Sequence, residues 1–483
     1  MNIVLNKYPS ASLIDGQWIT SASTFPVHDP ATGKEIARVP NLGIKETNAA
    51  IDAASRALPA WSGRTAKDRA TILKRWFELV TADTESLALL MTTEQGKPLA
   101  EARAEVAYGA SFIEWFAEEG KRAYGRTIPT TVASRRYITI KQPIGVVAAI
   151  APWNFPIAMI TRKVAPALAA GCTIVVKPSE ETPLCALAIA KLAVDAGVPP
   201  GVLNVVTTMD APAVGKVLTD DGRVRKLTFT GSTEVGKALY RQCAGTVKKL
   251  TLELGGNAPL VIFDDADLEQ AVAGAMASKY RNAGQTCVCA NRILVQKGIY
   301  DRFAAALVDA VAKLQTGPGT DARSNIGPLI NADAIFKVET LTKDAISKGA
   351  KLLIGGKANS SGPLFYEPTV LGGITKNMDL VREEIFGPVA ALMRFDSEAE
   401  AIALANDTPF GLAAYLFSQN LSRAWRVAEK LDAGMIGVND GIFSNEVVPF
   451  GGVKESGVGR EGAAEGLDEY LETKYICLGA IDT

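Results

Sequence analysis

The stretch from Gly145 to Leu254 alternates between short apolar runs and helical segments, and this alternation constrains the fold more than any other feature of the chain. Strands that are buried on both faces of a parallel sheet need such continuous apolar runs, and each intervening helix covers one of the faces. We therefore expect a parallel, doubly wound α/β sheet whose ligands bind at the carboxyl ends of its strands. The expected strands are 145–150, 173–176, 202–206, 226–230 and 250–254.

A second alternating region runs from Pro259 to about Val438 and predicts a second α/β sheet. Segments 127–141 and 469–478 read as strands that lie outside both regions. Such strands suggest an arm that pairs across the subunits of a homodimer or homotetramer, although an added edge strand is an equal alternative. We divide the chain into 1–122 with 142–252, then 253–448, and an arm of 123–141 with 467–483.

The composition and charge are those of an ordinary globular chain. Its 483 residues are 48% hydrophobic and 21% charged, with a formal net charge of -1. We therefore expect no nucleic-acid partner and no membrane partner. Six scattered cysteines do not form a disulfide framework, which favours a reducing compartment, the cytoplasm. Residues 1–13 lack the apolar core of a secretory signal, and no apolar run approaches the length of a spanning helix.

Cys287 is the candidate nucleophile, because a thiolate is the strongest nucleophile among the common side chains. It follows a Gly-Gln-Thr turn, and Cys289 lies two residues further on. For an isolated cysteine, a buried and inert thiol is the simpler interpretation. The single histidine, His28, lies in an N-terminal loop, so the base for any covalent chemistry is a carboxylate or a water molecule.

Two glycine-rich motifs resemble nucleotide-binding signatures without matching them fully. The segment 231–237 fits a phosphate-binding loop except that Ala238 replaces the magnesium-binding Ser or Thr, which argues against an ATPase. It does follow a strand and open a helix, where free N–H groups and the Ser232 hydroxyl can hold a pyrophosphate. The segment 457–462 has no apolar strand directly before it and is expected to be a loop.

Six segments, in order and with the right spacing, carry a resemblance to the aldehyde dehydrogenase superfamily: 152–156, 177–180, 229–236, 252–256, 284–287 and 383–388. The resemblance covers essentially the whole chain. It implies two parallel doubly wound Rossmann-like sheets and a small β oligomerisation arm. The nucleotide-binding domain would be 1–122 with 142–252, and the catalytic domain 253–448. Segments 159–163, 286–292 and 449–454 are similar to the succinate-semialdehyde dehydrogenase branch in particular.

The resemblance implies three catalytic roles. Cys287 would attack the aldehyde carbon, and the Asn154 side-chain amide with the Cys287 backbone N–H would hold the oxyanion. Removing one such donor typically lowers the rate by about 10²–10³-fold. Glu253 would activate the water that hydrolyses the thioester, which supplies the base that histidine cannot. A solvated carboxylate beside the Gly255-Gly256 pair is the alternative for Glu253.

The resemblance also implies NAD as the cofactor, with NADP possible. A carboxylate at position 180 accepts hydrogen bonds from a free 2′-hydroxyl and repels a 2′-phosphate, which favours NAD. Lys177 and Ser179 nearby can still tolerate NADP. The cofactor-binding residues that match the family are Trp153, Lys177, Ser179, Glu180, Gly231, Ser232, Gly236, Glu384 and Phe386.

The expected substrate is a small aldehyde with an anionic end. Arg162, Arg281 and Ser444 match the residues that hold the far carboxylate in the branch, and the planar fork of arginine suits that task. The loop 439–448 departs from the branch at Asp440 and at the bulkier Phe443. Succinate semialdehyde is therefore the first expectation, with glutarate semialdehyde or sulfolactaldehyde as alternatives.

Three further hypotheses remain from the sequence. Cys289 is a possible redox partner of Cys287, although a packed small residue is the simpler role because a Cys-x-Cys bridge is strained. A dehydrogenase that passes the acyl group to coenzyme A is a second activity class, against which Glu253 argues. A non-catalytic structural relative is the third, against which the joint presence of Cys287, Asn154 and Glu253 argues. We expect no metal site.

Overall fold

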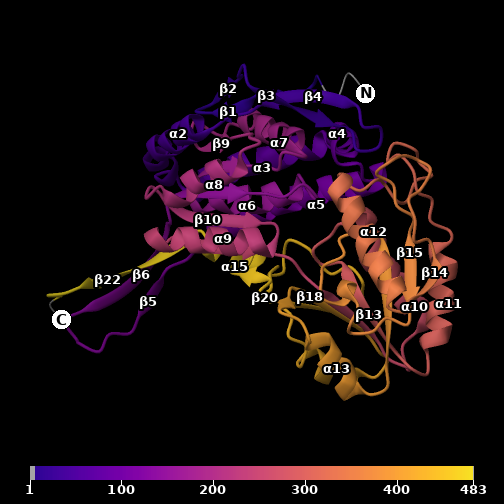
Figure 1. The fold of residues 1–483 in the computed structure, drawn as a ribbon. Helices are drawn as coiled ribbons and strands as arrows, with labels where there is room; N and C mark the ends of the chain where they lie inside the picture. Colours follow the sequence, from indigo (N-terminus) through magenta and orange to yellow (C-terminus); the bar gives the residue numbers. More distant parts are fainter. Residues whose placement is uncertain (1–5, 482–483) are drawn as a thin grey trace.

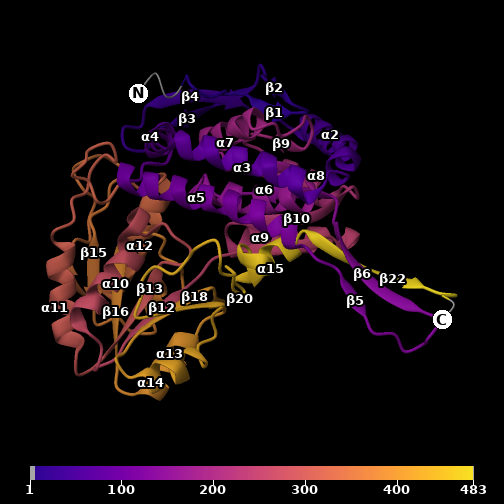
Figure 2. The ribbon, with the colours of Figure 1, turned by 180° about the vertical axis from the view of Figure 1, so that it is seen from behind.

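The computed structural model describes residues 6–481, arranged as two α/β lobes and a projecting arm (Figures 1 and 2). The predicted fold class, two doubly wound sheets and a small β arm, is confirmed. Within residues 6–481, no helix is both long and apolar enough to cross a membrane. Residues 1–5 and 482–483, which the sequence assigned to the first domain and to the arm, lie outside the described residues.

The first sheet has eight strands in the order β2-β1-β9-β8-β7-β10-β11-β21. The five strands from β9 to β11 are parallel, as predicted, and the three outer strands are antiparallel additions. The segment 457–462 was predicted to be a loop; two of its residues instead form β21, because their backbone pairs with Leu252 and Glu253. The strands are β1 (Ser12–Ile14), β2 (Gln17–Ile19), β7 (Val146–Ile150), β8 (Thr173–Lys177), β9 (Leu203–Val205), β10 (Val224–Thr230), β11 (Lys249–Glu253) and β21 (Gly457–Val458).

Helices cover both faces of this sheet, which explains why its strands are apolar throughout. Val147 and Ala149 of β7 face one hydrophobic core, while Val146 and Ala148 face the other. One face packs against α2 (Ile44–Ser62), α8 (Ala211–Asp220) and α9 (Thr233–Cys243). The other packs against α6 (Ala158–Ala170) and α7 (Pro183–Asp195), with α3 (Ala66–Ala82), α4 (Thr84–Gln95) and α5 (Leu99–Glu119) as an outer layer.

The second sheet has seven strands in the order β14-β15-β16-β13-β12-β18-β19, all parallel except the edge strand β14. This confirms the second alternating region. The strands are β12 (Ala258–Ile262), β13 (Ala290–Gln296), β14 (Lys351–Ile354), β15 (Thr369–Gly372), β16 (Val389–Phe395), β18 (Ala413–Phe417) and β19 (Met435–Val438). The helices of this lobe are α10 (Leu268–Tyr280), α11 (Tyr300–Val311), α12 (Ala332–Ser347), α13 (Glu398–Asn406) and α14 (Leu421–Ala428).

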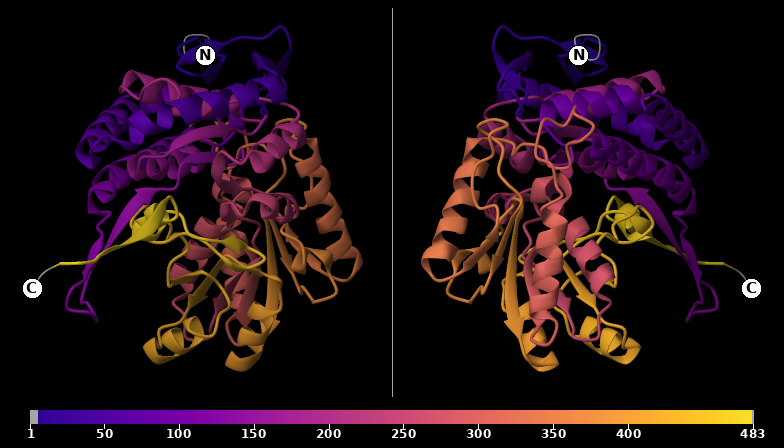
Figure 3. Two further views of the ribbon diagram at one scale, coloured as in Figure 1. Left: turned by 90° about the vertical axis from the view of Figure 1, so that its left-hand side faces the viewer. Right: turned by 90° about the vertical axis from the view of Figure 1, so that its right-hand side faces the viewer.

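A three-stranded antiparallel sheet projects from the body of the molecule (Figures 1 and 3). It combines β5 (Arg126–Ile128), β6 (Arg136–Pro143) and β22 (Leu471–Leu478), which follows α15 (Ala463–Asp468). The two strand-like segments outside the main sheets therefore pair with each other in one chain. The smaller elements are β3 (Thr24–His28), β4 (Glu35–Pro40), β17 (Phe410–Gly411), β20 (Val453–Lys454), η1 (Gly120–Arg122), η2 (Ala244–Thr246), η3 (Arg281–Gly284) and η4 (Asp379–Val381).

The chain crosses between the two sheets in the short segment 254–257. β11 ends at Glu253, beside Thr230 at the end of β10, and β12 begins at Ala258, beside Ala290 at the start of β13. The carboxyl edge of the first sheet thus meets the amino edge of the second. Residues that end β11 and residues that precede β13 are brought together there, although they are far apart in sequence.

Candidate active site

The turn that carries Cys287 has an unusual backbone. Asn282, Ala283 and Gly284 have φ angles of 53°, 54° and 75°, so three successive residues adopt the left-handed conformation between α10 and β13. Only glycine adopts this conformation without cost. A Cβ at Gly284 would also lie 2.2 Å from the Gly387 carbonyl oxygen. Glycine at position 284 is therefore required by the left-handed backbone and by close contact with Gly387.

Asn154 lies against this turn from the first lobe. Its side-chain Nδ2 donates to the Gln285 backbone carbonyl oxygen at 3.1 Å. Its backbone carbonyl oxygen accepts a hydrogen bond from Asn282 Nδ2 at 3.0 Å. A carboxamide nitrogen carries two N–H donors, so one remains for another acceptor. Asn154 is 4% exposed, and it lines one cavity together with Cys287.

The cavity between the two lobes has a volume of about 330 Å³. Trp153 and Phe386 meet edge to face there, with ring centroids 5.6 Å apart. The opening turn of α9 reaches it, where Ser232 caps the helix by accepting a hydrogen bond from the Val235 N–H. Eight of the predicted site residues line this cavity: Trp153, Asn154, Gly231, Ser232, Glu253, Cys287, Glu384 and Phe386.

Four predicted cofactor residues lie outside the lining of this cavity. Lys177 is the last residue of β8, Ser179 and Glu180 follow it, and Lys177 Nζ pairs with Glu180 Oε2 at 2.7 Å. Gly236 lies within α9, where an added Cβ would lie 2.3 Å from Leu254 Cδ2. Glycine at 236 therefore allows α9 to approach the end of β11, which is a packing role.

Glu253 is a buried carboxyl group at the end of β11. It is 2% exposed, and neither side-chain oxygen has a hydrogen-bond partner within the described residues. Burial, reinforced by the nearby Glu461 carboxylate, raises the pKa of Glu253 well above its ordinary value. A carboxyl group whose raised pKa favours its neutral form, and which lies beside a cavity, is typical of a group that exchanges protons.

The Cys287 thiol is also held in its neutral form. Burial raises the pKa of Cys287 to about 12, with smaller increases from the Glu384 and Glu253 carboxylates, while the positive charge of Arg162 lowers it. Glu384 is itself affected, because burial raises its pKa to about 7. At neutral pH the protein alone therefore holds a thiol, and not a thiolate, at this position.

Arg162 is already paired in the structure. Its Nε lies 2.5 Å from Glu461 Oε2, and Lys163 Nζ pairs with the other oxygen of the same carboxylate. The Arg162 Nη1 has no hydrogen-bond partner within the described residues. The guanidinium also lies 4.1 Å from the centre of the Phe450 ring. The predicted substrate contact of Arg162 is thus limited to the part of the guanidinium that Glu461 leaves free.

Arg281 is the less restrained of the two arginines. Within residues 6–481 it forms no ion pair, and its guanidinium lies 5.3 Å from the centre of the Phe155 ring. Arg281 and Ser444 line an outer cavity of about 190 Å³. A narrow space of about 20 Å³ lies next to it, and Arg162, Arg281, Ser444 and Cys287 all line that space. The structure therefore brings all three predicted substrate residues to Cys287, the predicted nucleophile.

Residues 18–476 match the family model described as the aldehyde dehydrogenase family. The chain belongs to the aldehyde dehydrogenase family.

Relatives with assigned activities align over nearly the whole of this aldehyde dehydrogenase. A succinate-semialdehyde dehydrogenase [NADP(+)] from Escherichia coli is 58% identical, over 98% of each chain. A glutarate-semialdehyde dehydrogenase from Pseudomonas aeruginosa is 57% identical, over 97% of each chain. The crystal structure of a succinate-semialdehyde dehydrogenase from Burkholderia pseudomallei is similar with a TM-score of 0.97 and 58% identity, over 98% of each chain. The predicted resemblance to the succinate-semialdehyde dehydrogenase branch is confirmed.

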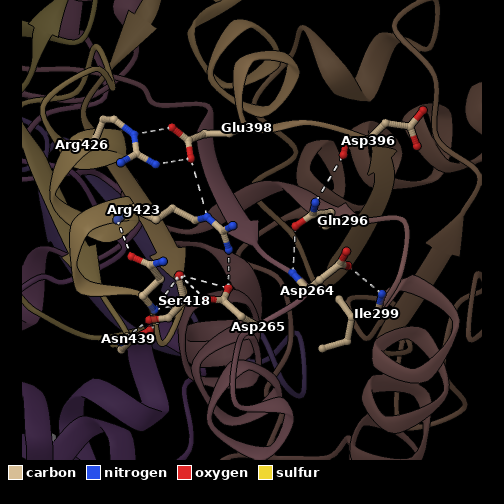
Figure 4. A network of polar contacts seen from close by, with 11 residues as sticks. Asp264, Asp265, Gln296, Ile299, Asp396, Glu398, Ser418, Arg423, Arg426 and Asn439 are labelled. Carbon is tan, nitrogen blue, oxygen red and sulfur yellow. Dashed lines mark hydrogen bonds and ion pairs between the residues drawn. The ribbon is translucent and has the colours of Figure 1, made fainter.

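A polar network anchors the loop 439–448 of this aldehyde dehydrogenase (Figure 4). Asn439 has a φ of 55°, and its side chain exchanges two hydrogen bonds of 3.0 Å with the Ser418 backbone. The Ser418 hydroxyl bonds to Asp265, which pairs with Arg423 at 2.7 Å. The network thus fixes the start of the loop at the carboxyl edge of the second sheet, from which the loop returns to place Ser444 beside Arg281.

Phe443 and Cys289 both pack away from the substrate cavities. Phe443 lies against Tyr415, with ring centroids 5.1 Å apart, and the Tyr415 hydroxyl donates to the Val288 carbonyl oxygen at 2.6 Å. The Phe443 side chain therefore packs against the tyrosine that holds the backbone next to Cys287. Cys289 is a free thiol that donates to the Lys279 carbonyl oxygen at 3.5 Å, so its redox role stays a prediction.

Sequence reasoning missed several residues that surround the site. Glu461 was included in a predicted loop, yet it is 2% exposed and neutralises two cations of α6. The adjacent Arg162 and Lys163 in an otherwise apolar helix were the available signal, because buried cations require a buried acid. Asp333 and Lys337 of α12 also line the larger cavity.

The raised pKa of Cys287 predicts its reactivity in the free enzyme. Iodoacetamide should modify Cys287 slowly at pH 7, and the rate should rise about tenfold per pH unit up to pH 10, because only the thiolate reacts. Peptide mass spectrometry measures the rate for each cysteine separately, and the exposed Cys477 reports on the reagent in the same sample. A Cys287 rate that levels off near pH 8 would show that the thiolate is already present at neutral pH.

Proposed function

We propose that this aldehyde dehydrogenase oxidises a short aldehyde with a carboxylate at its far end, converting succinate semialdehyde to succinate with NAD(P)+. The observation that carries this proposal is the position of Arg281. It forms no ion pair within the described residues and shares cavity walls with Ser444 and Cys287. The activities assigned to the relatives from Escherichia coli and Pseudomonas aeruginosa support the same substrate class.

In the proposed reaction, the Cys287 thiol loses its proton to water as its sulfur bonds to the aldehyde carbon, and the carbonyl oxygen becomes the oxyanion of a thiohemiacetal. The free N–H of the Asn154 carboxamide and the Cys287 backbone N–H then stabilise the oxyanion. NAD(P)+, when bound, supplies the oxidation by accepting the hydride. The resulting thioester is attacked by water, Glu253 removes the water proton, and the acid leaves as the Cys287 thiol is restored.

The wall of the cavity between the lobes suits the phosphate and nicotinamide parts of a dinucleotide. The α9 amino end offers the N–H groups that favour phosphate, while the aromatic pair Trp153 and Phe386 and the Glu384 carboxylate lie elsewhere on its wall. Lys177, Ser179 and Glu180 would hold the adenosine ribose, with Gly231 and Ser232 at the phosphates. Glu180 favours NAD because its carboxylate repels a 2′-phosphate, and its ion pair with Lys177 weakens that repulsion enough to admit NADP.

Glu253 supports a hydrolytic reaction over transfer to coenzyme A, since it places a proton acceptor in the Cys287 cavity.

We further propose a nucleotide-binding domain of 1–122 with 142–252 and a catalytic domain of 253–448. The arm of 123–141 with 467–483 would join subunits of a homodimer or homotetramer. Free cysteines throughout the described residues support a cytoplasmic location.

Arg281→Ala should discriminate between acid-bearing and neutral aldehydes. The kcat/KM for succinate semialdehyde should fall by about 10–100-fold, because a hydrogen-bonded charge contributes about 1.5–3 kcal/mol. The value for propanal should stay within about twofold, since propanal has no carboxylate to lose. Steady-state assays with both substrates, and with glutarate semialdehyde and sulfolactaldehyde, measure the change. Equal losses for propanal and the acid-bearing aldehydes would contradict a carboxylate contact.

Glu180→Ser should shift cofactor preference toward NADP. The NADP/NAD ratio of kcat/KM should rise by about five- to tenfold, because removing the charge relieves a repulsion of about 1 kcal/mol. Asp195→Ser, at the far end of α7, is a matched control that removes a surface carboxylate. An unchanged ratio in Glu180→Ser would contradict the assignment of this residue to the 2′ position.

A further inference from the structure

Lys97 and Glu105 form a buried ion pair beside the turn that carries Asn154. Their side chains are each 1% exposed, and the pair joins the α4–α5 connection to α5. A buried pair of charges persists only when both partners are fully bonded, because desolvation otherwise exceeds their attraction. The positions of the remaining donors and acceptors therefore indicate what the pair holds in place.

The Lys97 ammonium has three N–H donors, and the structure pairs two of them with oxygen acceptors. One N–H meets Glu105 Oε2, and a second donates to the Asn154 carbonyl oxygen at 2.8 Å. The ammonium also lies 4.1 Å from the centre of the Phe155 ring, which is a cation–π distance. Two of the three interactions thus fix Asn154 and its neighbour.

The second oxygen of Glu105 holds the other end of the same turn. Glu105 Oε1 accepts hydrogen bonds from the N–H groups of Ile157 and Ala158, at 2.9 and 3.3 Å. These are donors at the amino end of α6, which has no side-chain cap of its own. A carboxylate there also complements the helix dipole. The pair therefore clamps the turn at Asn154 and at the first residues of α6.

The same stretch of chain also holds the nucleophile turn. Gln95 Nε2 donates to Asn282 Oδ1 at 3.1 Å, and the Asn282 N–H donates to Glu101 Oε2 at 2.8 Å. Asn282 in turn donates to the Asn154 carbonyl oxygen, which Lys97 also contacts. Segment 95–105 thus sets the position of Asn154 relative to the Cys287 turn.

We propose that Lys97 is a positioning residue for the oxyanion-binding amide of Asn154, and that Glu105 supports it. This rests on the oxyanion role proposed above for Asn154. Lys97 lines the outer cavity together with Arg281 and Ser444, but it lines neither the larger cavity nor the narrow space beside Cys287. It fixes the backbone from which the Asn154 side chain extends. Its contribution should appear in the chemical step and should disappear when the Asn154 amide is absent.

The test uses the double variant Lys97→Met with Glu105→Gln in the full-length enzyme. Removing both charges avoids an unpaired buried charge, and glutamine at 105 retains an oxygen for the α6 amino end. We expect kcat for succinate semialdehyde to fall by about 10–100-fold, approaching the loss of one oxyanion donor. The KM for NAD should change by less than about twofold, because the pair does not line the larger cavity.

A double-mutant cycle with Asn154→Ala separates positioning from general damage. If Lys97 acts through the Asn154 amide, the pair substitution should lower kcat by less than about twofold further in the Asn154→Ala background. Equal fold-losses in both backgrounds would overturn the proposal, as would full activity of the pair variant. Lys121→Met with Glu118→Gln, a more exposed pair near the end of α5, is the matched control and should leave kcat unchanged.

The outcomes also separate this inference from the proposed function. If Asn154→Ala itself retains parental kcat, the oxyanion role fails, and the inference fails with it. If Asn154→Ala is impaired while the pair variant is unimpaired, only the positioning role is overturned. Lys97→Arg, which keeps a charged donor, should retain more activity than the pair variant if it folds with the parental thermal midpoint; a lower kcat at that midpoint would contradict the proposed contact.

Discussion

The hydrogen bonds between the Asn154 turn and the Cys287 turn are the interaction on which the site depends. One turn follows a strand of the first sheet and the other precedes a strand of the second, so neither lobe contains the site alone. Asn282 and Asn154 each donate toward Gln285, and Asn282 also holds the Asn154 carbonyl oxygen. The left-handed backbone at 282–284 makes this contact possible because it turns the chain sharply at the lobe junction.

Burial and the pairing of opposite charges together set the electrostatics around the site. Burial raises the pKa values of both Cys287 and Glu253, while the positive charges of Arg162 and Lys163 are largely neutralised by Glu461. Arg281 is the exception, since it has no carboxylate partner within the described residues. A site that neutralises its own charges but leaves one arginine free is well suited to an anionic substrate.

The sequence predicted the features that depend on local patterns, such as the strands, and those that depend on short motifs, such as the candidate site residues. Apolar runs such as 146–150 identified the parallel strands, because strands covered on both faces have no polar side. Linear motifs predicted roles for Cys287, Asn154 and Glu253, and the structure places all three in the wall of one cavity. The sequence did not reveal the partners that arrive from distant segments, such as Glu461 and Lys97, because their roles depend on tertiary contacts. The pairing of residues 457–458 with β11 was missed for the same reason.

The central claim is that the Cys287 sulfur carries an acyl group that Glu253 helps water to remove. The most direct measurement is a rapid-quench intact-mass experiment on Glu253→Gln with succinate semialdehyde and NAD. The account predicts an initial burst of about one reduced cofactor per subunit, a stoichiometric acyl adduct on Cys287, and slow turnover afterwards, because hydrolysis has lost its base. Parental steady-state turnover with no adduct would contradict the account.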